Sequence, residues 1–116
     1  MPDPNCIFCK IAAGELKSDI VHQDDRIVAF RDMNPQAPTH VLVVPRRHVA
    51  TINDLEEEDA EVAGRLFLVA AKVAAAEGVD QSGYRVVMNC MEGAGQSVFH
   101  IHLHVLGGRP FRWPPG

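Results

Sequence analysis

The sequence predicts the α+β fold class: a five-stranded antiparallel sheet with one long and one short helix. Apolar, largely β-branched residues at 26–32 and 41–45 are typical of two strands. Residues 84–89 and 98–106 predict two more strands, so four of the five strands are located in the sequence. Between these pairs, residues 55–77 have apolar side chains at helical spacings, which predicts one long helix.

The first elements are a brief helix and two strands. Residues 6–13 are mostly apolar and are followed by Gly14, a common helix C-cap, so they predict the short helix. In the strand at 26–32, alternate side chains point to opposite faces of the sheet. One face would carry Ile27, Ala29 and Arg31, and the other Val28 and Phe30. The run VLVVP at 41–45 predicts a central strand that is buried on both faces.

The long helix is predicted from apolar residues that lie three, four or seven positions apart. They are Leu55, Val62, Leu66, Val69 and Val73. Acidic residues at 56–59 and 61 would lie in its first turns, where the helix dipole favours negative charge, and Gly78 is typical of a helix end. The acidic run could instead bind a cation, but a solvated helix start explains it without a ligand. We therefore expect no chemistry there.

Composition and charge limit the classes of function. The 116 residues carry a formal net charge of -4 and predict one domain over 1–116. Because binding to nucleic acid needs clustered Lys and Arg, no nucleic-acid partner is expected. The sequence has neither a signal-like start nor an apolar run that could cross a bilayer, so we expect no membrane partner and a cytoplasmic location. Three cysteines, two of them in a C-x-x-C pair, favour a reducing compartment over a disulfide framework.

Three histidines alternate with apolar residues near the C-terminus. In a strand, His100, His102 and His104 would share one face, while Ile101 and Leu103 would point to the other. A solvent-facing strand would be satisfied by any polar residue, whereas three imidazoles together favour a reaction surface. One metal ion bound by all three is not expected, because such neighbours lie about 6.5–7 Å apart along a strand.

A glycine-bearing loop precedes the three histidines. Gly93 and Gly95 would supply backbone N–H groups and Ser97 a hydroxyl, and such groups hold anionic oxygens. The imidazole of His102, largely neutral near pH 7, could then attack a phosphorus atom held by the loop. The loop alone would equally suit a plain hairpin. Its place beside the histidines favours phosphoryl-type transfer.

The segment GQSVFHIHLHVLGGR at 95–109 resembles the H-φ-H-φ-H-φ-φ signature of the histidine-triad (HIT) family, in which φ marks an apolar residue. DMNPQAPTHVLVVP at 32–45 and WPPG at 113–116 resemble the histidine triad nucleotide-binding branch of that family. The resemblance implies a HIT-like fold and a purine nucleoside phosphoramidase. Such an enzyme splits the P–N bond of AMP-amine or aminoacyl-adenylate-like substrates through a nucleotidyl-histidine intermediate.

The same resemblance implies a role for each site residue. His102 matches the nucleophile, His40 a residue that orients its imidazole, and His104 a contact of the phosphate or leaving group. Asp32 matches the carboxylate that accepts the ribose hydroxyls. The other nucleotide contacts would be Asn89, Gly95, Gln96 and Ser97, the last also acting in catalysis, with Phe8, Ile11, Phe30 and Leu42 around the purine. Without the resemblance, Asp32 could equally cap a turn, and the apolar residues could simply belong to the core.

Met91 and Ala94 depart from the family pattern, in which glycines are common at both places. If either position requires a positive φ, its side chain adds about 1 kcal/mol of strain or changes the course of the loop. This difference bears on leaving-group preference. Cys90 lies in the same loop and is expected to pack inertly, because the histidine chemistry needs no thiol.

A structural zinc ion is the expected cofactor. Cys6-x-x-Cys9 has a ligand spacing found in structural zinc sites, which need four ligands. His48 and His100 have no assigned catalytic role and would complete the set. Several HIT relatives hold zinc with a similar Cys, Cys, His, His group. A free cysteine pair and a thioredoxin-like redox motif are the alternatives, although the βαβ context that redox motifs prefer is absent.

Two other functions remain open beside phosphoramidate hydrolysis. One is a nucleotide-dependent interaction module, in which slow hydrolysis only resets a bound state. The other is hydrolysis of dinucleotide polyphosphates, as in another branch of the HIT family. Turnover distinguishes an enzyme from an interaction module, and a comparison of the two substrate types distinguishes the two enzymes.

The open edges of a five-stranded sheet predict a homodimer in which the sheet continues across a two-fold axis. The segment 109–116 contains three prolines and cannot add a regular strand, while Phe111 and Trp113 are too apolar for a free end. These rings could pack on the chain's own helix. Relatives in the nucleotide-binding branch instead place this terminus across the dimer interface, so we expect it to shape the partner's active site.

Overall fold

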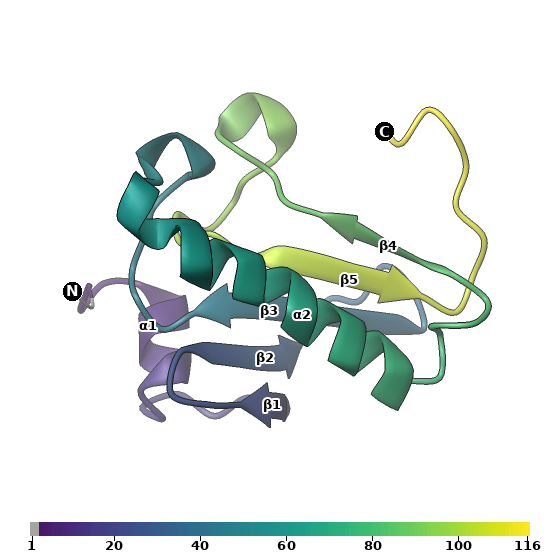
Figure 1. Ribbon diagram of the computed structural model, residues 1–116, viewed down its shortest axis with the longest axis horizontal. Helices are drawn as coiled ribbons and strands as arrows, with labels where there is room; N and C mark the ends of the chain where they lie inside the picture. The colour runs from purple at the N-terminus through teal and green to yellow at the C-terminus, as the bar shows by residue number, and fades with distance from the viewer. Residues whose placement is uncertain (1–2) are drawn as a thin grey trace.

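A five-stranded antiparallel sheet organises the protein, and the computed structural model describes residues 3–116. The strand order is β1 (Ile20–Gln23), β2 (Ile27–Arg31), β3 (Thr39–Pro45), β5 (Leu103–Gly107) and β4 (Tyr84–Val87). Helix α2 (Ala60–Ala76) lies across one face, and the short helix α1 (Ile7–Ala12) packs on the other (Figure 1). The predicted α+β class with five antiparallel strands and two helices is confirmed.

Strand β3 is the centre of the sheet and is buried along its whole length. It pairs Leu42 with Phe30 of β2 on one side and with His104 of β5 on the other. Neighbouring strands cover both of its edges, and buried apolar clusters cover its two faces, so β3 has no solvent-facing side. The prediction for residues 41–45 is confirmed, and the strand begins two residues earlier, at Thr39.

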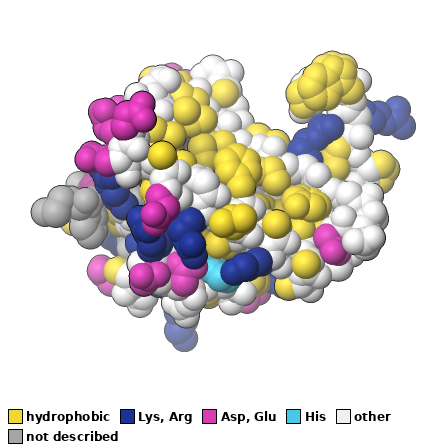
Figure 2. Space-filling model, viewed as in Figure 1, with side chains coloured by type: hydrophobic (Ala, Val, Ile, Leu, Met, Phe, Trp, Pro, Cys, Tyr) yellow, Lys and Arg dark blue, Asp and Glu magenta, His cyan; other side chains and the backbone are white. Residues whose placement is uncertain are grey.

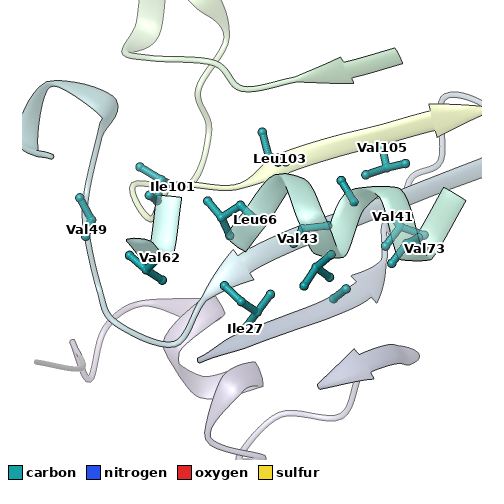
Figure 3. Packing of buried hydrophobic residues seen from close by; sticks show 13 residues of the cluster. Ile27, Val41, Val43, Val49, Val62, Leu66, Val73, Ile101, Leu103 and Val105 are labelled. Atoms are coloured by element: carbon teal, nitrogen blue, oxygen red, sulfur yellow. The ribbon is translucent and has the colours of Figure 1, made fainter. Parts of the chain in front are cut away.

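Two apolar clusters, one on each face of the sheet, hold the helices in place. Under α2 the cluster includes Ile27, Val41, Val43, Leu66, Val69, Ile101, Leu103 and Val105 (Figure 3). Under α1 it includes Phe8, Ile11, Val28, Phe30, Leu42 and Val44. Alternate residues of β2 therefore enter different clusters, as its pattern predicts. Each fully buried aliphatic side chain contributes about 1.5–3 kcal/mol, so both helices are firmly anchored.

Strand β5 is shorter than predicted. The strand was expected over 98–106, but the ladder begins only at Leu103. The reason is that the preceding backbone bonds elsewhere: Ile101 N–H donates to the carbonyl of Val49 at 2.8 Å, and the carbonyl of His100 accepts a side-chain hydrogen bond. The alternation nevertheless holds, because Ile101 and Leu103 enter the core under α2.

The long helix begins at Ala60, not at residue 55 as predicted. Two 3₁₀ turns, Ile52–Asp54 and Glu57–Asp59, precede it because carboxylates fold back onto the backbone there. Asp59 accepts a hydrogen bond from Glu56 N–H and forms an ion pair with Arg47. It is 1% exposed, so the expectation of a wholly solvated acidic run is wrong at this residue.

One strand was not predicted, whereas the two predicted helix ends agree with the structure. The edge strand β1 was not located from the sequence, because its four residues are exposed at both ends and show no buried face. Gly14 and Gly78, expected at the ends of the helices, have φ of +78° and +75°, as helix termination of this kind requires. Among residues 3–116, none of the helices has the length and apolar character needed to span a membrane.

Asp24 stabilises the turn between β1 and β2, and its contribution should depend on pH. Its carboxylate accepts hydrogen bonds from Arg26 N–H and Ile27 N–H and faces His22 Nε2, each at 2.8 Å. Burial raises the pKa of Asp24, but these hydrogen bonds outweigh it and lower the pKa from 3.8 to about 2. A depressed carboxyl pKa means that the stabilisation is complete well above pH 4 and is lost as pH falls towards 2.

Asp24→Asn should therefore lower the free energy of unfolding by about 1 kcal/mol at pH 7. The difference from wild type should narrow as pH falls from 4 to 2, because wild type loses the carboxylate there too. Urea unfolding across this range measures it. Asp25→Asn, at the exposed neighbour, is the matched control. A difference that stays constant with pH would contradict this account of the turn.

Candidate active site

A pocket of about 420 Å³ opens between α1 and the sheet. This volume is within the range of sites that hold small organic ligands. Its apolar wall contains Ile7, Phe8, Ile11, Leu16, Phe30, Met33, Leu42 and Val98. Its polar groups include Asp32, Ser97, His102 and His104. Eight of the residues predicted for the nucleotide site from sequence therefore line one pocket.

The packing of α1 on the sheet creates this arrangement. Phe8 projects from α1 and meets Phe30 of β2 edge to face, with ring centroids 5.4 Å apart. The ring of His102 lies 5.0 Å from Phe8 in the same type of contact. His104 stands opposite Leu42 in the β3–β5 register. An apolar slot and two imidazoles thus meet on the face of the sheet that α1 covers.

The hydrogen bond of His102 fixes which of its ring nitrogens is free. Nδ1 lies 2.7 Å from the carbonyl oxygen of His100. A carbonyl can only accept, so Nδ1 carries the hydrogen and Nε2 keeps its lone pair. Burial lowers the pKa of His102, which keeps the imidazole neutral near pH 7. A neutral imidazole whose Nε2 carries a free lone pair can act as a nucleophile.

His40 sets the tautomer of His104. The N–H of Gln36 donates to Nδ1 of His40 at 3.0 Å, so the hydrogen of His40 is on Nε2. That nitrogen lies 2.9 Å from Nδ1 of His104 and 3.4 Å from a carboxylate oxygen of Asp32. Nδ1 of His104 therefore accepts, and Nε2 of His104 carries a hydrogen. Burial lowers the pKa of His104 to about 4, so this ring too is neutral.

The contacts of His40 correct one prediction. His40 was expected to orient the imidazole of His102, but its ring bonds that of His104. His102 is oriented by the backbone of His100, two residues away in the same chain segment. The physical reason is register: His40 is in β3 and His104 is in the paired part of β5, whereas His102 lies before the ladder begins.

The glycine-bearing loop is arranged differently from the prediction. The N–H of Gly95 donates to the carbonyl of Glu92 at 2.9 Å, and that of Gln96 donates to the carbonyl of Met91 at 3.1 Å. Both N–H groups close the loop on itself, so that of Gly95, one of the two expected to form a phosphate nest, is already used within the loop. Ser97 does line the pocket. The structure does not place Asn89 on the pocket wall.

Met91 has the backbone conformation that its departure from glycine made questionable. Its φ is +72° and its ψ is 172°, a region populated almost entirely by glycine. Ala94 does not have a positive φ, so its side chain introduces no such strain. Of the two departures from glycine, only Met91 therefore introduces backbone strain in this loop.

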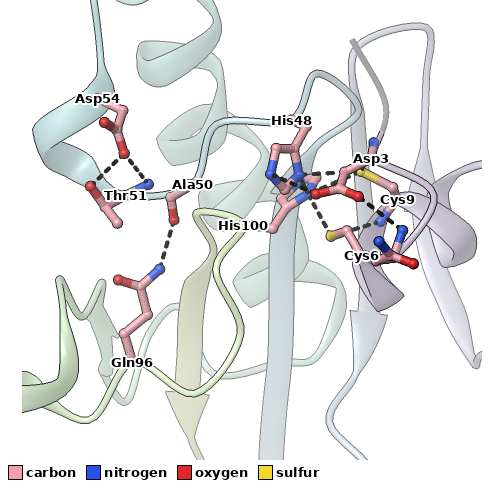
Figure 4. Close-up of polar contacts among 10 residues, drawn as sticks. Asp3, Cys6, Cys9, His48, Ala50, Thr51, Asp54, Gln96 and His100 are labelled. Carbon is pink, nitrogen blue, oxygen red and sulfur yellow. Dashed lines mark hydrogen bonds and ion pairs between the residues drawn. The ribbon is translucent and has the colours of Figure 1, made fainter.

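Four further residues gather beside the pocket and could hold a metal ion. Cys6, Cys9, His48 and His100 place one ligand atom each within 4.8 Å of one another (Figure 4). Sγ of Cys6 lies 3.3 Å from Nδ1 of His100, and Nδ1 of His48 lies 3.2 Å from the same atom. Ligands around a tetrahedral zinc ion lie about 3.3–3.8 Å apart, so the set is close to that geometry.

The surroundings of this cluster favour metal binding. Nε2 of His100 lies 2.7 Å from the carbonyl of Pro45, which places its hydrogen there and leaves Nδ1 as a ligand. Burial raises the pKa of the Cys6 thiol, so a thiolate at this position needs a nearby cation. The ring of His100 thus belongs to the cluster, while its backbone carbonyl accepts the hydrogen bond from His102 Nδ1. The predicted ligand set is brought together by the fold.

Known proteins are similar to this chain in sequence over most of its length. The sequence model of the HIT domain matches residues 13–111. The chain belongs to the HIT family. A purine nucleoside phosphoramidase of Escherichia coli K12 is 52% identical over 104 residues, which cover 90% of this chain and 87% of that protein. The protein of the same name from Shigella flexneri matches to the same extent.

Solved structures of HIT proteins share the fold. A HIT family hydrolase from Legionella pneumophila Philadelphia 1 has a TM-score of 0.94 and 54% identity, covering 97% of this chain and 100% of that chain. A histidine triad protein from Clostridium difficile has a TM-score of 0.93 and 43% identity, covering 97% of each chain. The resemblance inferred from residues 95–109 is therefore confirmed at the level of family and fold.

Several residues of the HIT pocket were missed by sequence reasoning. Ile7 and Leu16 line it although they are 48% and 40% exposed. Ile7 lies within the predicted helix at 6–13 and Leu16 just after it, and the sequence does not show that either side chain stays exposed. Lys17 and Ser18 also line the pocket, but no pattern in the sequence distinguishes them from ordinary surface residues.

Proposed function

We propose that this HIT protein is a purine nucleoside phosphoramidase that hydrolyses the P–N bond of AMP-amine or aminoacyl-adenylate-like substrates. The 52% identical relative from Escherichia coli carries that activity in its name. The structural observation that carries the proposal is the hydrogen bond from His102 Nδ1 to the His100 carbonyl. It leaves an unprotonated Nε2 on a residue that lines a nucleotide-sized pocket.

The reaction is proposed to proceed in two displacements at phosphorus. Nε2 of His102 attacks, the Nε2–P bond forms, and the P–N bond breaks. The amine leaves with the bonding electron pair and takes up a proton from solvent. Water then attacks the nucleotidyl-histidine, which gives the nucleoside monophosphate, a free imidazole and a released proton. During both steps the Nδ1–H of His102 stays bonded to the His100 carbonyl, which accommodates positive charge on the ring.

The other groups of the pocket are proposed to hold the nucleotide. The apolar wall around Phe8 and Phe30 would take the purine. Asp32 and Ser97 line the same pocket. Asp32 is proposed to accept the ribose hydroxyls, and Ser97 to donate its hydroxyl to a phosphate oxygen. The hydrogen on Nε2 of His104 provides a second donor for the phosphate or the leaving amine. Fixed donors of this kind stabilise charge that develops in the transition state.

A substrate comparison tests the proposed function. Adenosine phosphoramidate conjugates and a diadenosine polyphosphate should be assayed at matched concentrations by steady-state kinetics. We expect much higher kcat/KM for the P–N substrate. A preference for the dinucleotide would assign the protein to the polyphosphate-hydrolysing type. Tight AMP binding with no turnover of either substrate would favour the interaction module and contradict the proposal.

We also propose that the cluster of Cys6, Cys9, His48 and His100 binds a structural zinc ion. Two thiolates and two imidazoles suit zinc in charge and softness. A bound ion would tie α1 to the segments carrying the two histidines. The ring of His100 would be held in this cluster while its carbonyl orients His102. Reduced thiols are needed for such a site, which supports a cytoplasmic location.

A homodimer is the proposed assembly. The edge strands β1 and β4 have one unpaired side each within the described part of the chain. Phe67 and Leu68 of α2 are 57% and 60% exposed, and Figure 2 shows hydrophobic side chains gathered over this face. Such a surface next to an open sheet edge suits a second copy of the chain, with the sheet continuing across the axis.

The C-terminal tail supports the same assembly. It runs past the edge strand β4, where Arg85 donates to the carbonyl of Arg112 at 3.0 Å (Figure 1). Phe111 is covered by Arg85 and Arg109, but Trp113 is 83% exposed. The alternative that both rings pack on the chain's own helix is therefore wrong for Trp113. A partner subunit is proposed to cover it.

Deleting residues 111–116 should change catalysis more than stability. If the tail borders the partner's leaving-group site, we expect kcat/KM to fall by about 10-fold and the preference among amines to change. The Tm should change little, because the tail contributes little to either apolar cluster. Sedimentation and kinetics with several amines measure this. A fully active monomer, or unchanged amine selectivity after truncation, would contradict the proposed assembly.

A further inference from the structure

The side-chain amide of Gln96 is buried, and both its oxygen and its nitrogen form hydrogen bonds within the protein. It is 4% exposed. Its Oε1 accepts a hydrogen bond from Met91 N–H at 2.8 Å. Its Nε2 donates to the carbonyl of Ala50 at 2.8 Å (Figure 4). It also donates to the carbonyl of Val98 at 3.1 Å. A nucleotide could take this amide only by leaving buried backbone groups unpaired, at a cost of about 1–3 kcal/mol each.

The bonds of Gln96 span the loop that precedes His102. One holds Met91, whose strained φ of +72° needs a compensating contact. Another holds Val98, which lines the pocket together with Ser97. The loop is therefore fastened at both ends by one side chain. Without it, the strain at Met91 would be relieved by a change in the backbone that carries Ser97.

The Ala50 carbonyl that Gln96 contacts belongs to a fixed part of the structure. Thr51, the next residue, forms a capping box with Asp54, with Thr51 N–H 3.1 Å and Thr51 Oγ1 2.8 Å from the Asp54 carboxylate (Figure 4). On the other side, the carbonyl of Val49 accepts a hydrogen bond from Ile101 N–H. The segment 49–51 thus anchors both the loop, through Gln96, and Ile101, the residue directly before His102.

We propose that Gln96 is a positioning residue for phosphoramidate hydrolysis, whose amide holds loop 91–98 so that the Ser97 hydroxyl faces the reacting phosphate. This inference rests on the proposed function and replaces the direct nucleotide contact expected for Gln96. It also explains how the chain tolerates Met91 at a position with glycine-like φ. Correct placement of Ser97 matters because misplacement by about 1 Å can cost 100-fold in rate.

The test compares Gln96→Met, which keeps the length and removes all three hydrogen bonds, with Gln96→Glu, which keeps the acceptor for Met91 N–H. For Gln96→Met we expect kcat to fall by about 10-fold or more and KM to change less, because the nucleoside wall and Asp32 are untouched. The kcat of Gln96→Glu should also fall, because its carboxylate keeps the acceptor for Met91 N–H but has no hydrogen to donate to the carbonyls of Ala50 and Val98. Adding Met91→Gly to Gln96→Met should restore part of kcat, because glycine adopts the required φ without strain.

Amide hydrogen exchange gives a readout that does not depend on activity. In Gln96→Met, exchange at Met91 should accelerate and the NMR signal of Ser97 N–H should shift, while the core of β3 stays protected. Wild-type kcat in a folded Gln96→Met would overturn the proposal. So would a loss of kcat with unchanged Met91 and Ser97 amides, since that result means direct substrate contact. If Gln96→Met does not fold, Gln96→Glu decides by the same two readouts.

The two readouts also separate this inference from the proposed function. A wild-type protein without phosphoramidase activity refutes the proposed function, and with it the catalytic role of Gln96. Faster exchange at Met91 in the variants would then still establish that Gln96 holds the loop. Active wild type with variant amides unchanged would refute the inference alone.

Discussion

His102→Ala should abolish phosphoramidate hydrolysis while AMP still binds with an affinity close to that of wild type. The substitution removes the only nitrogen that the proposal assigns to attack on phosphorus, so kcat should fall by at least about 10⁴-fold. The apolar wall, Asp32 and Ser97 remain. Calorimetry with AMP and steady-state assays with an AMP-amine conjugate measure the two quantities on the same preparation.

A matched histidine control makes this result specific. His22 lies outside the pocket and bonds Asp24, so His22→Ala should leave kcat/KM unchanged. Full activity in His102→Ala would refute its assignment as the nucleophile. Loss of AMP binding together with activity would show that His102 holds the nucleotide as well, and the adduct measurement described below would then decide its role.

Replacing Cys6 and Cys9 together with serine should remove the zinc and lower the Tm by more than about 10 °C. Metal that binds only the folded chain at 1,000 times its Kd contributes about 4 kcal/mol, which corresponds to a shift of that size in a domain of this length. A metal bound by Cys6 and Cys9 together with His48 and His100 would tie α1 to the core, so its loss should loosen the helix that forms one wall of the pocket. Elemental analysis should find close to one zinc per chain in wild type.

The third cysteine provides the control for this prediction. Cys90 is half-buried and lies outside the cluster, so Cys90→Ser should keep both the metal content and the Tm. The measurement requires reduced protein that has never been exposed to chelator. Wild-type protein without zinc under those conditions would refute the metal assignment, as would a double variant that retains the metal.

The parts of the fold that could be predicted are those that a local pattern of apolar and polar residues determines. The two faces of β2 and the burial of β3 follow from alternation and from a β-branched run, because burial acts on each residue through its immediate strand geometry. The faces of Ile101 and Leu103 were predictable for the same reason. Strand β1 has only four residues and no buried face, so no such repeat indicates it.

The parts that could not be predicted depend on hydrogen bonds between distant segments. The bond of His40 to His104 is set by the register of β3 against β5. The amide of Gln96 joins its loop to Ala50, 46 residues earlier. The start of α2 was placed too early because Asp59 folds back onto Glu56 and also pairs with Arg47. Residue types alone do not determine such partners.

The central claim, that His102 attacks phosphorus, is tested most directly by trapping the intermediate. Enzyme mixed with excess AMP-amine conjugate should be quenched in the first turnover, digested under conditions that preserve phosphoramidates, and analysed by mass spectrometry. The account predicts a nucleotidyl adduct on His102, formed together with a burst of released amine and absent in His102→Ala. An adduct on another residue, or amine release at the full wild-type rate from His102→Ala, would contradict it.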